Sequence, residues 1–270
     1  MEDRLLKELD RIGRTTGAKI LKIYEGSFEV KKKADGSPIT IADKLADEYI
    51  TEELLKLEGN IPILTEEGKA WDFKQRSKWS EFWLVDPIDG TRSFTTGKGQ
   101  FTVNIALIKD RRPVLGMVYA PLRDISYVGN AEKGMAWKSA GGDTVQISTR
   151  DRQSDLAVLA SKNHRTPRDD SFLERLKMQF PTMELLSESS SLKFCAIAEG
   201  KADLYSRFEH TYEWDLGAAH AVLLAAGGEI FNTDGSLFRF NKQNLLNDAF
   251  LGVGDTNKEW VEFLVELANR

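Results

Sequence analysis

The segment with the clearest chemical potential begins at Asp86 and reads Asp-Pro-Ile-Asp-Gly-Thr. A short apolar run, 83–85, precedes it. We predict that this run is a buried strand that ends in a sharp turn from Pro87 to Gly90. Two carboxylates, Asp86 and Asp89, would then be held on a rigid turn beside small residues. Such a turn can hold a hard cation and let a phosphate group approach the backbone.

Asp, Pro and Gly are also frequent in turns that have no chemical role, so the segment does not establish a site by itself. An EF-hand loop is excluded, because the alternating Asp spacing is missing and Gly97 stands where the closing Glu would be. The Asp-x-Asp spacing of phosphatases with an aspartyl nucleophile is missing as well. A functional site therefore needs partners from elsewhere in the chain.

Acidic residues at three other places could supply these partners. Asp43 and Asp215 each open a predicted apolar helix, and Glu66-Glu67 follows a short predicted strand. Each of these residues also has a simpler interpretation. Thr40 and Asp43 fit a capping box, and Asp215 can be a helix cap. Glu66 and Glu67 can be surface charges. If these residues converge on segment 86–91, the carboxylates meet without a cation, which is unfavourable unless metal ions bind. Oxygen ligands without His or Cys favour Mg²⁺.

The composition places the chain among ordinary globular proteins. It has 270 residues, 41% hydrophobic and 29% charged, enough for one large domain or two fused halves. A net charge of -5 excludes general nucleic-acid binding. The single cysteine, Cys195, permits no internal disulfide, and three histidines show no zinc-ligand spacing. A charged N-terminus and short apolar stretches predict neither a signal peptide nor a membrane span. We expect a cytoplasmic protein, either free or peripheral to the inner face of the membrane.

Hydrophobic periodicity predicts mixed helices and strands throughout. Helices are predicted at 5–23, 40–57, 170–179, 190–200, 216–226 and 258–269. Strands are predicted at 61–64, 101–109, 113–119, 125–129, 135–147 with a break at 141–142, 156–160 and 202–208, with a hairpin at 229–240. The polar stretch 148–154 predicts a boundary between an N-terminal α+β half, 1–150, and a C-terminal α/β half, 151–270, within one compact unit. Mixed elements in both halves predict a layered α/β sandwich with alternating helix and sheet layers.

The acidic series, in its order and spacing, resembles the inositol monophosphatase superfamily of Mg²⁺-dependent, lithium-sensitive phosphomonoesterases. The motif Trp-x-Val-Asp-Pro-x-Asp-Gly-Thr at 83–91 and the pair Trp214-Asp215 carry this resemblance. A finer resemblance points to the 3'(2'),5'-bisphosphate nucleotidases of the CysQ type. It is carried by the stretches 33–43, 101–108, and 190–200 with 204–207. One departure is Arg92-Ser93, where the family has Lys-Glu, so the positive charge is kept and the acidic neighbour is lost.

The resemblance implies a role for each site residue. Glu66, Asp86 and the backbone carbonyl of Ile88 are implied to hold a first Mg²⁺. Asp86, Asp89 and Asp215 are implied to hold a second, with two or three ions in all. Asp43 and Thr91 are implied to orient and help deprotonate the attacking water, so that no covalent intermediate forms. The implied substrate-binding residues are Glu66, Ile88, Asp89, Gly90, Thr91, Ser190, Lys193, Arg207 and Asp215.

Ser190, Lys193 and Arg207 are candidates for binding a second phosphate, because a hydroxyl, an ammonium and a guanidinium suit a phosphate clamp. The alternative is that Lys193 and Arg207 are surface charges and Ser190 a helix cap. His164 could approach the nucleotide or belong to an ordinary loop. Cys195, inside an apolar helix, is expected to be a core thiol.

The predicted function is Mg²⁺-dependent hydrolysis of the 3'-phosphate of adenosine 3',5'-bisphosphate to AMP and phosphate, by two-metal activation of water. The alternatives are an inositol monophosphatase or other sugar-phosphate phosphatase of the same superfamily, and a non-catalytic metal- or nucleotide-binding protein. The expected partner is a small phosphorylated substrate, with no nucleic-acid polymer and no integral membrane segment. We expect a monomer or a homodimer.

Overall fold

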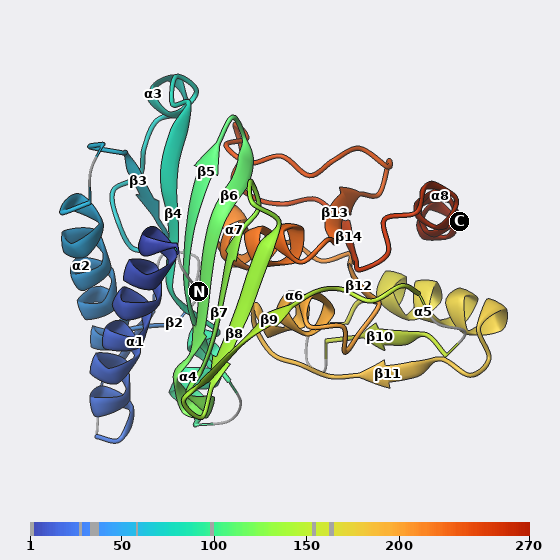
Figure 1. The fold of residues 1–270 in the computed structure, drawn as a ribbon, viewed down its shortest axis with the longest axis horizontal. Coiled ribbons are helices and arrows are strands. Elements are labelled where there is room, and N and C mark those ends of the chain that lie inside the picture. Colours follow the sequence, from blue (N-terminus) through green and yellow to red (C-terminus); the bar gives the residue numbers. More distant parts are fainter. Residues whose placement is uncertain are drawn as a thin grey trace.

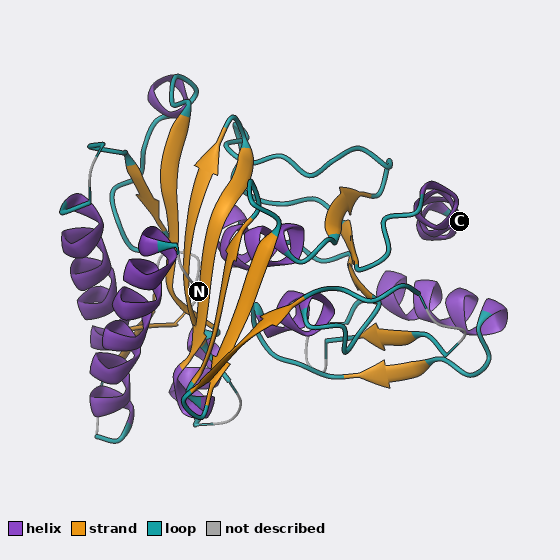
Figure 2. Ribbon diagram, viewed as in Figure 1, coloured by secondary structure: helices purple, strands orange, loops and turns teal. Residues whose placement is uncertain are grey.

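Helices and sheets alternate in layers along the long axis of the molecule (Figures 1 and 2). The computed structural model describes residues 3–26, 29–32, 38–57, 59–97, 100–152, 155–161 and 165–270. The motif residues 33–37 and His164 lie outside the described residues. From one end of the molecule to the other, the order is helix pair, large sheet, helix pair, smaller sheet and helix pair.

The first helix pair covers one face of the large sheet (Figure 1). Helix α1 (Arg4–Tyr24) is capped by Asp3, and helix α2 (Ile41–Leu55) by Thr40. Leu9 and Ile12 of α1 recur at helical spacing and are fully buried against the sheet. The sheet strands, in spatial order, are β3 (Ile63–Thr65), β4 (Glu81–Asp89), β5 (Thr102–Lys109), β6 (Arg112–Ala120), β7 (Ile125–Asn130), β8 (Met135–Ala140) and β9 (Asp143–Ile147). Only β3 and β4 pair in parallel; the other pairs are antiparallel.

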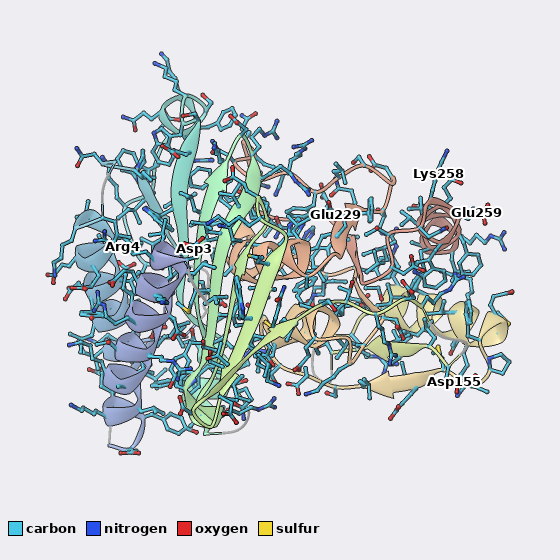
Figure 3. The ribbon with its side chains drawn as sticks, viewed as in Figure 1. Asp3, Arg4, Asp155, Glu229, Lys258 and Glu259 are labelled. Carbon is cyan, nitrogen blue, oxygen red and sulfur yellow. The ribbon has the colours of Figure 1, made fainter. Side chains whose placement is uncertain are left out.

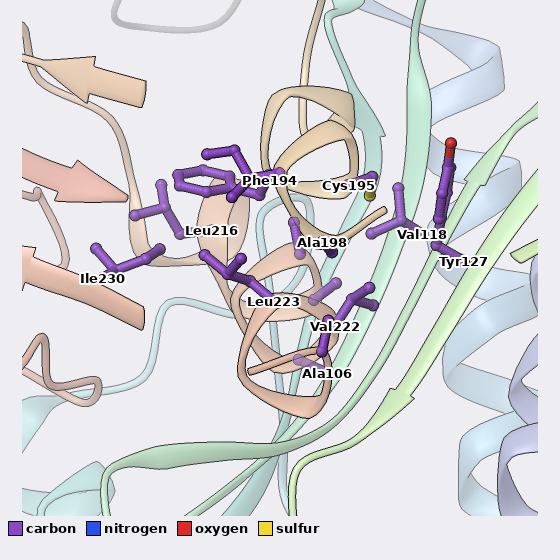
Figure 4. Packing of buried hydrophobic residues seen from close by; sticks show 14 of the residues in the cluster. Ala106, Val118, Tyr127, Phe194, Cys195, Ala198, Leu216, Val222, Leu223 and Ile230 are labelled. Atoms are coloured by element: carbon purple, nitrogen blue, oxygen red, sulfur yellow. The ribbon is translucent and has the colours of Figure 1, made fainter. Parts of the chain in front are cut away.

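The central helices lie between the two sheets (Figure 4). They are α6 (Leu192–Ala198) and α7 (Glu213–Ala225). Every residue of α6 is buried, and Figure 4 shows Val222 and Leu223 of α7 packed beside Phe194 and Ala198 of α6. Helix α7 approaches the large sheet closely at Gly116, where a Cβ atom would lie 2.2 Å from the carbonyl oxygen of Ala218. The apolar run that predicted α7 is therefore a helix buried on both faces.

The smaller sheet and the last helix pair complete the fold. The strands, in spatial order, are β11 (Glu184–Leu186), β10 (Ala157–Leu159), β12 (Leu204–Arg207), β14 (Phe250–Val253) and β13 (Glu229–Asn232). Helices α5 (Pro167–Gln179) and α8 (Lys258–Asn269) cover the outer face of this sheet. Leu176 of α5 and Trp260 of α8 are buried in the core between the helices and the sheet. The short elements are β1 (Val30–Lys32), β2 (Pro38–Thr40), α3 (Phe73–Arg76), α4 (Thr91–Thr96) and a 3₁₀ turn (Pro121–Arg123).

The predicted layered α/β sandwich is confirmed. The change from the large to the smaller sheet falls between β9 and β10, across the polar stretch 148–154. The division into two halves remains a prediction. Among the described residues, none of the helices combines the length and apolar character required to cross a bilayer.

One local prediction was wrong and another was correct only in part. Strand β4 does not end in a turn at Pro87 but continues to Asp89 through a bulge, because the Ile88 N–H donates to the Asp86 side chain instead of pairing with β5. At 229–240, the expected turn at Asp234-Gly235 is present, but the pairing of the two arms is short: a bridge between Phe231 and Leu237, with backbone hydrogen bonds from Asn232 to Ser236 and from Phe238 to Ile230. The ladder partner of β13 is β14, which the sequence analysis did not predict.

Candidate active site

The bulge at the end of β4 brings the first acidic residues together. Asp86 is only 1% exposed, and its Oδ1 accepts a hydrogen bond of 3.0 Å from the backbone N–H of Ile88. The parallel pairing of β3 with β4 is extended when the Glu66 N–H donates to the Val85 carbonyl at 3.2 Å. Glu66 therefore lies beside Asp86. Glu67 follows in the same loop and is half-buried.

Gly90 allows the chain to turn from β4 into α4. Its φ is 95°, in the left-handed region that glycine tolerates best. A Cβ atom at this position would lie 2.7 Å from the Ser190 hydroxyl oxygen and 3.2 Å from the Gln100 carbonyl oxygen. Helix α4 begins at the next residue, Thr91. A side chain at position 90 would therefore strain the backbone and displace Ser190.

Asp43 combines two roles that the sequence analysis treated as alternatives. Its Oδ2 accepts hydrogen bonds of 2.7 Å from the backbone N–H and the hydroxyl of Thr40, which completes the capping box of α2. Its Oδ1 accepts a bond of 3.2 Å from the Thr91 hydroxyl, which also lies 3.0 Å from the carbonyl oxygen of Ile88. The cap thus fixes a carboxylate whose second oxygen faces Thr91.

Asp215 reaches the site from α7 in the same way. It lies in the first turn, and its Oδ2 accepts a hydrogen bond of 2.8 Å from the Tyr212 N–H. Ser191, which the sequence analysis missed, joins this helix to β4. Its hydroxyl lies 3.1 Å from Asp89 Oδ2 and 3.1 Å from the Asp215 carbonyl oxygen. Ser191 is 2% exposed, so its buried hydroxyl connects Asp89 of β4 with the first turn of α7.

The carboxylates of this site repel one another. Burial, followed by the neighbouring charges of Glu66, Asp89 and Asp215, raises the pKa of Asp86 well above its usual range. Burial and the charge of Asp89 likewise raise the pKa of Asp215 well above its usual range. Burial also raises the pKa of Asp89, although Lys193 opposes the shift. The charge of Lys193 therefore does not offset the effect of burial on the pKa of Asp89.

The donor atoms of this site suit a magnesium ion. Carboxylate and carbonyl oxygens are the ligands that Mg²⁺ prefers, and mutual repulsion is what a bound cation would relieve. Asn104, which pairs with Asp86 across the β4–β5 ladder, has a buried Oδ1 without a hydrogen-bond partner in the described residues. Within those residues, no three acidic, histidine or cysteine side chains already have the spacing of a completed metal centre. The residues thus fit a metal by chemistry and charge.

A cationic side of the site faces these carboxylates. The Lys193 ammonium donates to the Ser190 carbonyl oxygen at 2.9 Å and lies 5.2 Å from the centre of the Tyr205 ring. Burial and the charge of Arg207 lower the pKa of Lys193 to about 8, although Asp89 opposes the shift. The Arg207 guanidinium lies 3.3 Å from the Glu209 carboxylate. Because both cations act electrostatically on the acidic residues, they border the same site.

The hydroxyl of Ser190 does not point freely outward. It lies 3.1 Å from the Asp89 carbonyl oxygen and 3.4 Å from that of Gln100, and its backbone has a left-handed φ of 51°. Ser190 therefore packs against the Gly90 turn. Cys195 is fully buried, as expected for a core thiol. The run of three serines at 189–191 signalled polar contacts here, but no sequence pattern tells which serine faces β4.

Comparison with known proteins shows the family of this chain. The sequence model of the inositol monophosphatase family matches residues 2–269. A curated relative, the 3'(2'),5'-bisphosphate nucleotidase CysQ of Salmonella typhimurium, is 41% identical over 250 residues, which are 91% of this chain and 98% of the relative. The CysQ of Haemophilus influenzae is 32% identical and covers 96% of each chain.

Solved structures have the same fold. The crystal structure of CysQ from Bacteroides thetaiotaomicron, described as a bacterial member of the inositol monophosphatase family, matches with a TM-score of 0.83 and 36% identity. That match covers 93% of this chain and 97% of the other.

Proposed function

The chain belongs to the inositol monophosphatase family, and we propose that it is a 3'(2'),5'-bisphosphate nucleotidase that hydrolyses the 3'-phosphate of adenosine 3',5'-bisphosphate. The products are AMP and inorganic phosphate. The substrate assignment rests on the curated relatives that share 32–41% of its sequence over most of the chain. The family is metal-dependent, typically with Mg²⁺.

One observation carries the chemistry. Asp86, Asp89 and Asp215 are gathered from two elements, and the pKa of each is raised by burial and by its neighbours. A protein gains nothing from such repulsion unless a cation relieves it. We propose that Glu66, Asp86 and the Ile88 carbonyl hold one Mg²⁺, and that Asp86, Asp89 and Asp215 hold another. Bound Mg²⁺ would make water more acidic and stabilise negative charge on the phosphate oxygens.

Thr91 and Asp43 prepare the attacking water. The Thr91 hydroxyl has one proton to donate, and Asp43 Oδ1 is an acceptor at 3.2 Å. The Thr91 oxygen can then accept a hydrogen bond from the water and orient it. Because Thr40 holds the other Asp43 oxygen, the carboxylate cannot rotate away without losing its cap. Water attacks phosphorus and the 3'-oxygen leaves, so no covalent enzyme intermediate is needed.

Lys193 and Arg207 bind the 5'-phosphate of the substrate. One ammonium and one guanidinium provide a point charge and a planar fork, which together suit a phosphate dianion. Ser190 supports this arrangement, because its carbonyl oxygen accepts a hydrogen bond from the Lys193 ammonium while its hydroxyl packs against the Gly90 turn. We further propose that residues 1–150 contribute most metal ligands and residues 151–270 contribute Asp215 and the phosphate clamp.

Phosphate release tests this function most simply. The purified protein is incubated with adenosine 3',5'-bisphosphate or inositol 1-phosphate, each with Mg²⁺ and with a chelator. We expect rapid, Mg²⁺-dependent release from the nucleotide and much slower release from inositol 1-phosphate. Equal rates on both substrates would contradict the nucleotidase assignment, while release from neither would contradict the phosphatase chemistry.

A further inference from the structure

A groove lined by basic residues lies outside the proposed active site. One hollow of about 480 Å³ is lined by Arg111, Arg239 and Lys242, among others. A second hollow of about 510 Å³ shares Arg111 and Lys242 with the first and is also lined by Phe73 and Trp79. None of the proposed metal-binding or phosphate-clamp residues lines either hollow. Together the two hollows form a groove, which we call the basic groove.

The basic groove is built where one hairpin turn meets a long connection. Strand β5 ends at Lys109 and turns through Asp110 and Arg111 into β6. In Figure 1 the connection between β13 and β14 extends toward this end of the large sheet, opposite α4. The Phe240 N–H donates to the Arg111 carbonyl at 3.1 Å, which fixes the connection against the turn. Lys109 lies about 24 Å from Thr102 along β5, at the spacing of an extended strand.

The charges of the basic groove are not balanced by its own residues. Lys242 forms an ion pair of 2.8 Å with Glu213. In the part of the chain that the structure describes, Arg111 and Arg239 form no ion pair, and Arg111 uses only its Nε, in a bond of 3.0 Å to the Phe240 carbonyl oxygen. The terminal nitrogens of Arg111 thus remain as a fork for an acceptor. Asp110 is the one acidic residue that lines the groove, in a chain whose net charge is -5.

The backbone at Arg111 adds a second observation. Its φ is 64°, and that of Asp110 is 49°, so both central residues of the turn are left-handed. Asn-Gly is the preferred sequence for such a turn, because a side chain in this region costs about 1 kcal/mol or more. The chain therefore places a guanidinium at a position where glycine would be easier. Strain of this kind is concentrated at functional positions.

We propose that the basic groove is a second binding site, for a phosphate-bearing aromatic anion of the nucleotide class. Guanidinium groups bind phosphate in a bidentate manner, and the half-buried aromatic side chains of Phe73 and Trp79 line the second hollow, where a base could contact them. The volume of either hollow is in the range of small-molecule sites. Arg111 and Arg239 bind the phosphate, while Lys242, which is paired with Glu213, lines the groove beside them.

Calorimetric titration with AMP in the presence of a chelator tests the proposal. The groove variant carries Arg111→Gln and Arg239→Gln, since glutamine keeps a donor for the Phe240 carbonyl. The active-site variant carries Arg207→Gln. The control variant carries Lys7→Gln and Lys177→Gln, which remove two exposed charges elsewhere. We expect a binding event that survives in the active-site and control variants and is weakened at least about tenfold in the groove variant.

The groove variant should hydrolyse the bisphosphate at the wild-type rate, which shows that it is folded. This activity also separates the two proposals, because the absence of AMP binding in the basic groove would leave the proposed nucleotidase activity unaffected. Unchanged AMP affinity in the groove variant would overturn the proposal. An equal loss of AMP affinity in the control variant would show that binding depends only on the overall charge of the protein, and this would also overturn the proposal. Inorganic phosphate that binds as tightly as AMP would overturn the role of the aromatic rings.

Discussion

Helix α7 has buried carboxylates near both ends, and the chain treats them differently. Beyond its last turn lies Glu229 of β13, which is labelled in Figure 3. Its Oε1 atom lies 2.7 Å from the Nε2 atom of His220, and its Oε2 atom accepts a hydrogen bond from Arg112. Burial alone would raise the pKa of Glu229, but these bonds lower it to about 2. In the first turn of α7, burial and the charges of Asp89 and Glu66 raise the pKa of Asp215. The pairing with Arg112 and His220 keeps the pKa of Glu229 low, whereas Lys193 and Arg207 do not offset the raised pKa values of Asp89 and Asp215.

This difference supports the proposed role of the acidic site in binding metal ions. A buried charge that serves only the fold is paired, because an unpaired one costs several kcal/mol. Lys193 and Arg207 lie near Asp89 and Asp215, yet the pKa values of both carboxylates stay raised. We propose that the remaining positive charge is supplied by a bound cation, and oxygen ligands favour Mg²⁺.

Removing one acidic ligand should have the largest effect. Asp86→Asn keeps the shape of the side chain and its bond from Ile88 but removes the charge. We expect phosphate release from the bisphosphate to fall roughly 1,000-fold or more, since metal stabilisation is worth several kcal/mol. In a chelator, the same variant should unfold at a higher temperature than the wild type, because repulsion is relieved. A variant that is both inactive and less stable would indicate a structural role, as at Glu229.

Loss of the clamp should have a smaller and more selective effect. Arg207→Gln removes a charge-assisted contact worth about 1.5–3 kcal/mol, so KM for adenosine 3',5'-bisphosphate should rise about 10–100-fold. Adenosine 3'-monophosphate lacks the 5'-phosphate, and its kcat/KM should remain unchanged. The matched control is Lys177→Gln, which removes an exposed charge on α5. An equal loss on both substrates would place Arg207 with the acidic ligands instead of the clamp.

Ser191 tests whether the two acidic segments act as one unit. Ser191→Ala removes the hydroxyl that lies between Asp89 and the first turn of α7. We expect the Mg²⁺ concentration for half-maximal activity to rise about tenfold, because one hydrogen bond to a charged group is lost. Ser191→Thr should restore most of the affinity. If both variants bind Mg²⁺ like the wild type in calorimetry, the serine serves packing alone.

The paired carboxylate should affect stability and not catalysis. The folded pKa of Glu229 is depressed, so its contribution to stability is present above the unfolded value of about 4.5 and is lost as pH falls toward 2. His220, whose pKa burial lowers, loses its contribution as pH falls below about 6.5. When measured by urea unfolding, the free energy of unfolding should therefore fall more steeply from pH 6 to pH 3 for the wild type than for Glu229→Gln. Parallel declines would contradict the pairing.

Much of the acidic site could be predicted because its residues lie at element ends. The ends of short strands and the first turns of helices are marked by changes in hydrophobic pattern, so Asp43, Glu66 and Asp215 were recognisable. Asp86 was recognisable from the Asp-Pro-Ile-Asp-Gly-Thr motif, although β4 continues beyond it to Asp89. The hydrophobic pattern could not show that one residue can both cap a helix and face the site. Asp43 has two carboxylate oxygens, one for Thr40 and one for Thr91.

The rest depended on contacts between distant segments. A bulge in β4 replaces the predicted turn because a side-chain oxygen of Asp86 competes for the Ile88 N–H, and periodicity carries no signal for this. Strand β14 is only four residues long and finds its partners across the chain. Ser191 and the basic groove depend on packing between segments about one hundred residues apart or more.

Thermal unfolding with increasing Mg²⁺ tests the central claim most directly, in the wild type and in Asp89→Asn. A ligand at 100 times its Kd adds about 2.7 kcal/mol to the free energy of unfolding. For a chain of this size that corresponds to a rise in Tm of about 5–10 °C. We predict this rise for the wild type and little or none for Asp89→Asn. A wild-type Tm that does not respond to Mg²⁺, or an equal rise in the variant, would contradict the assignment of the acidic site as the metal centre.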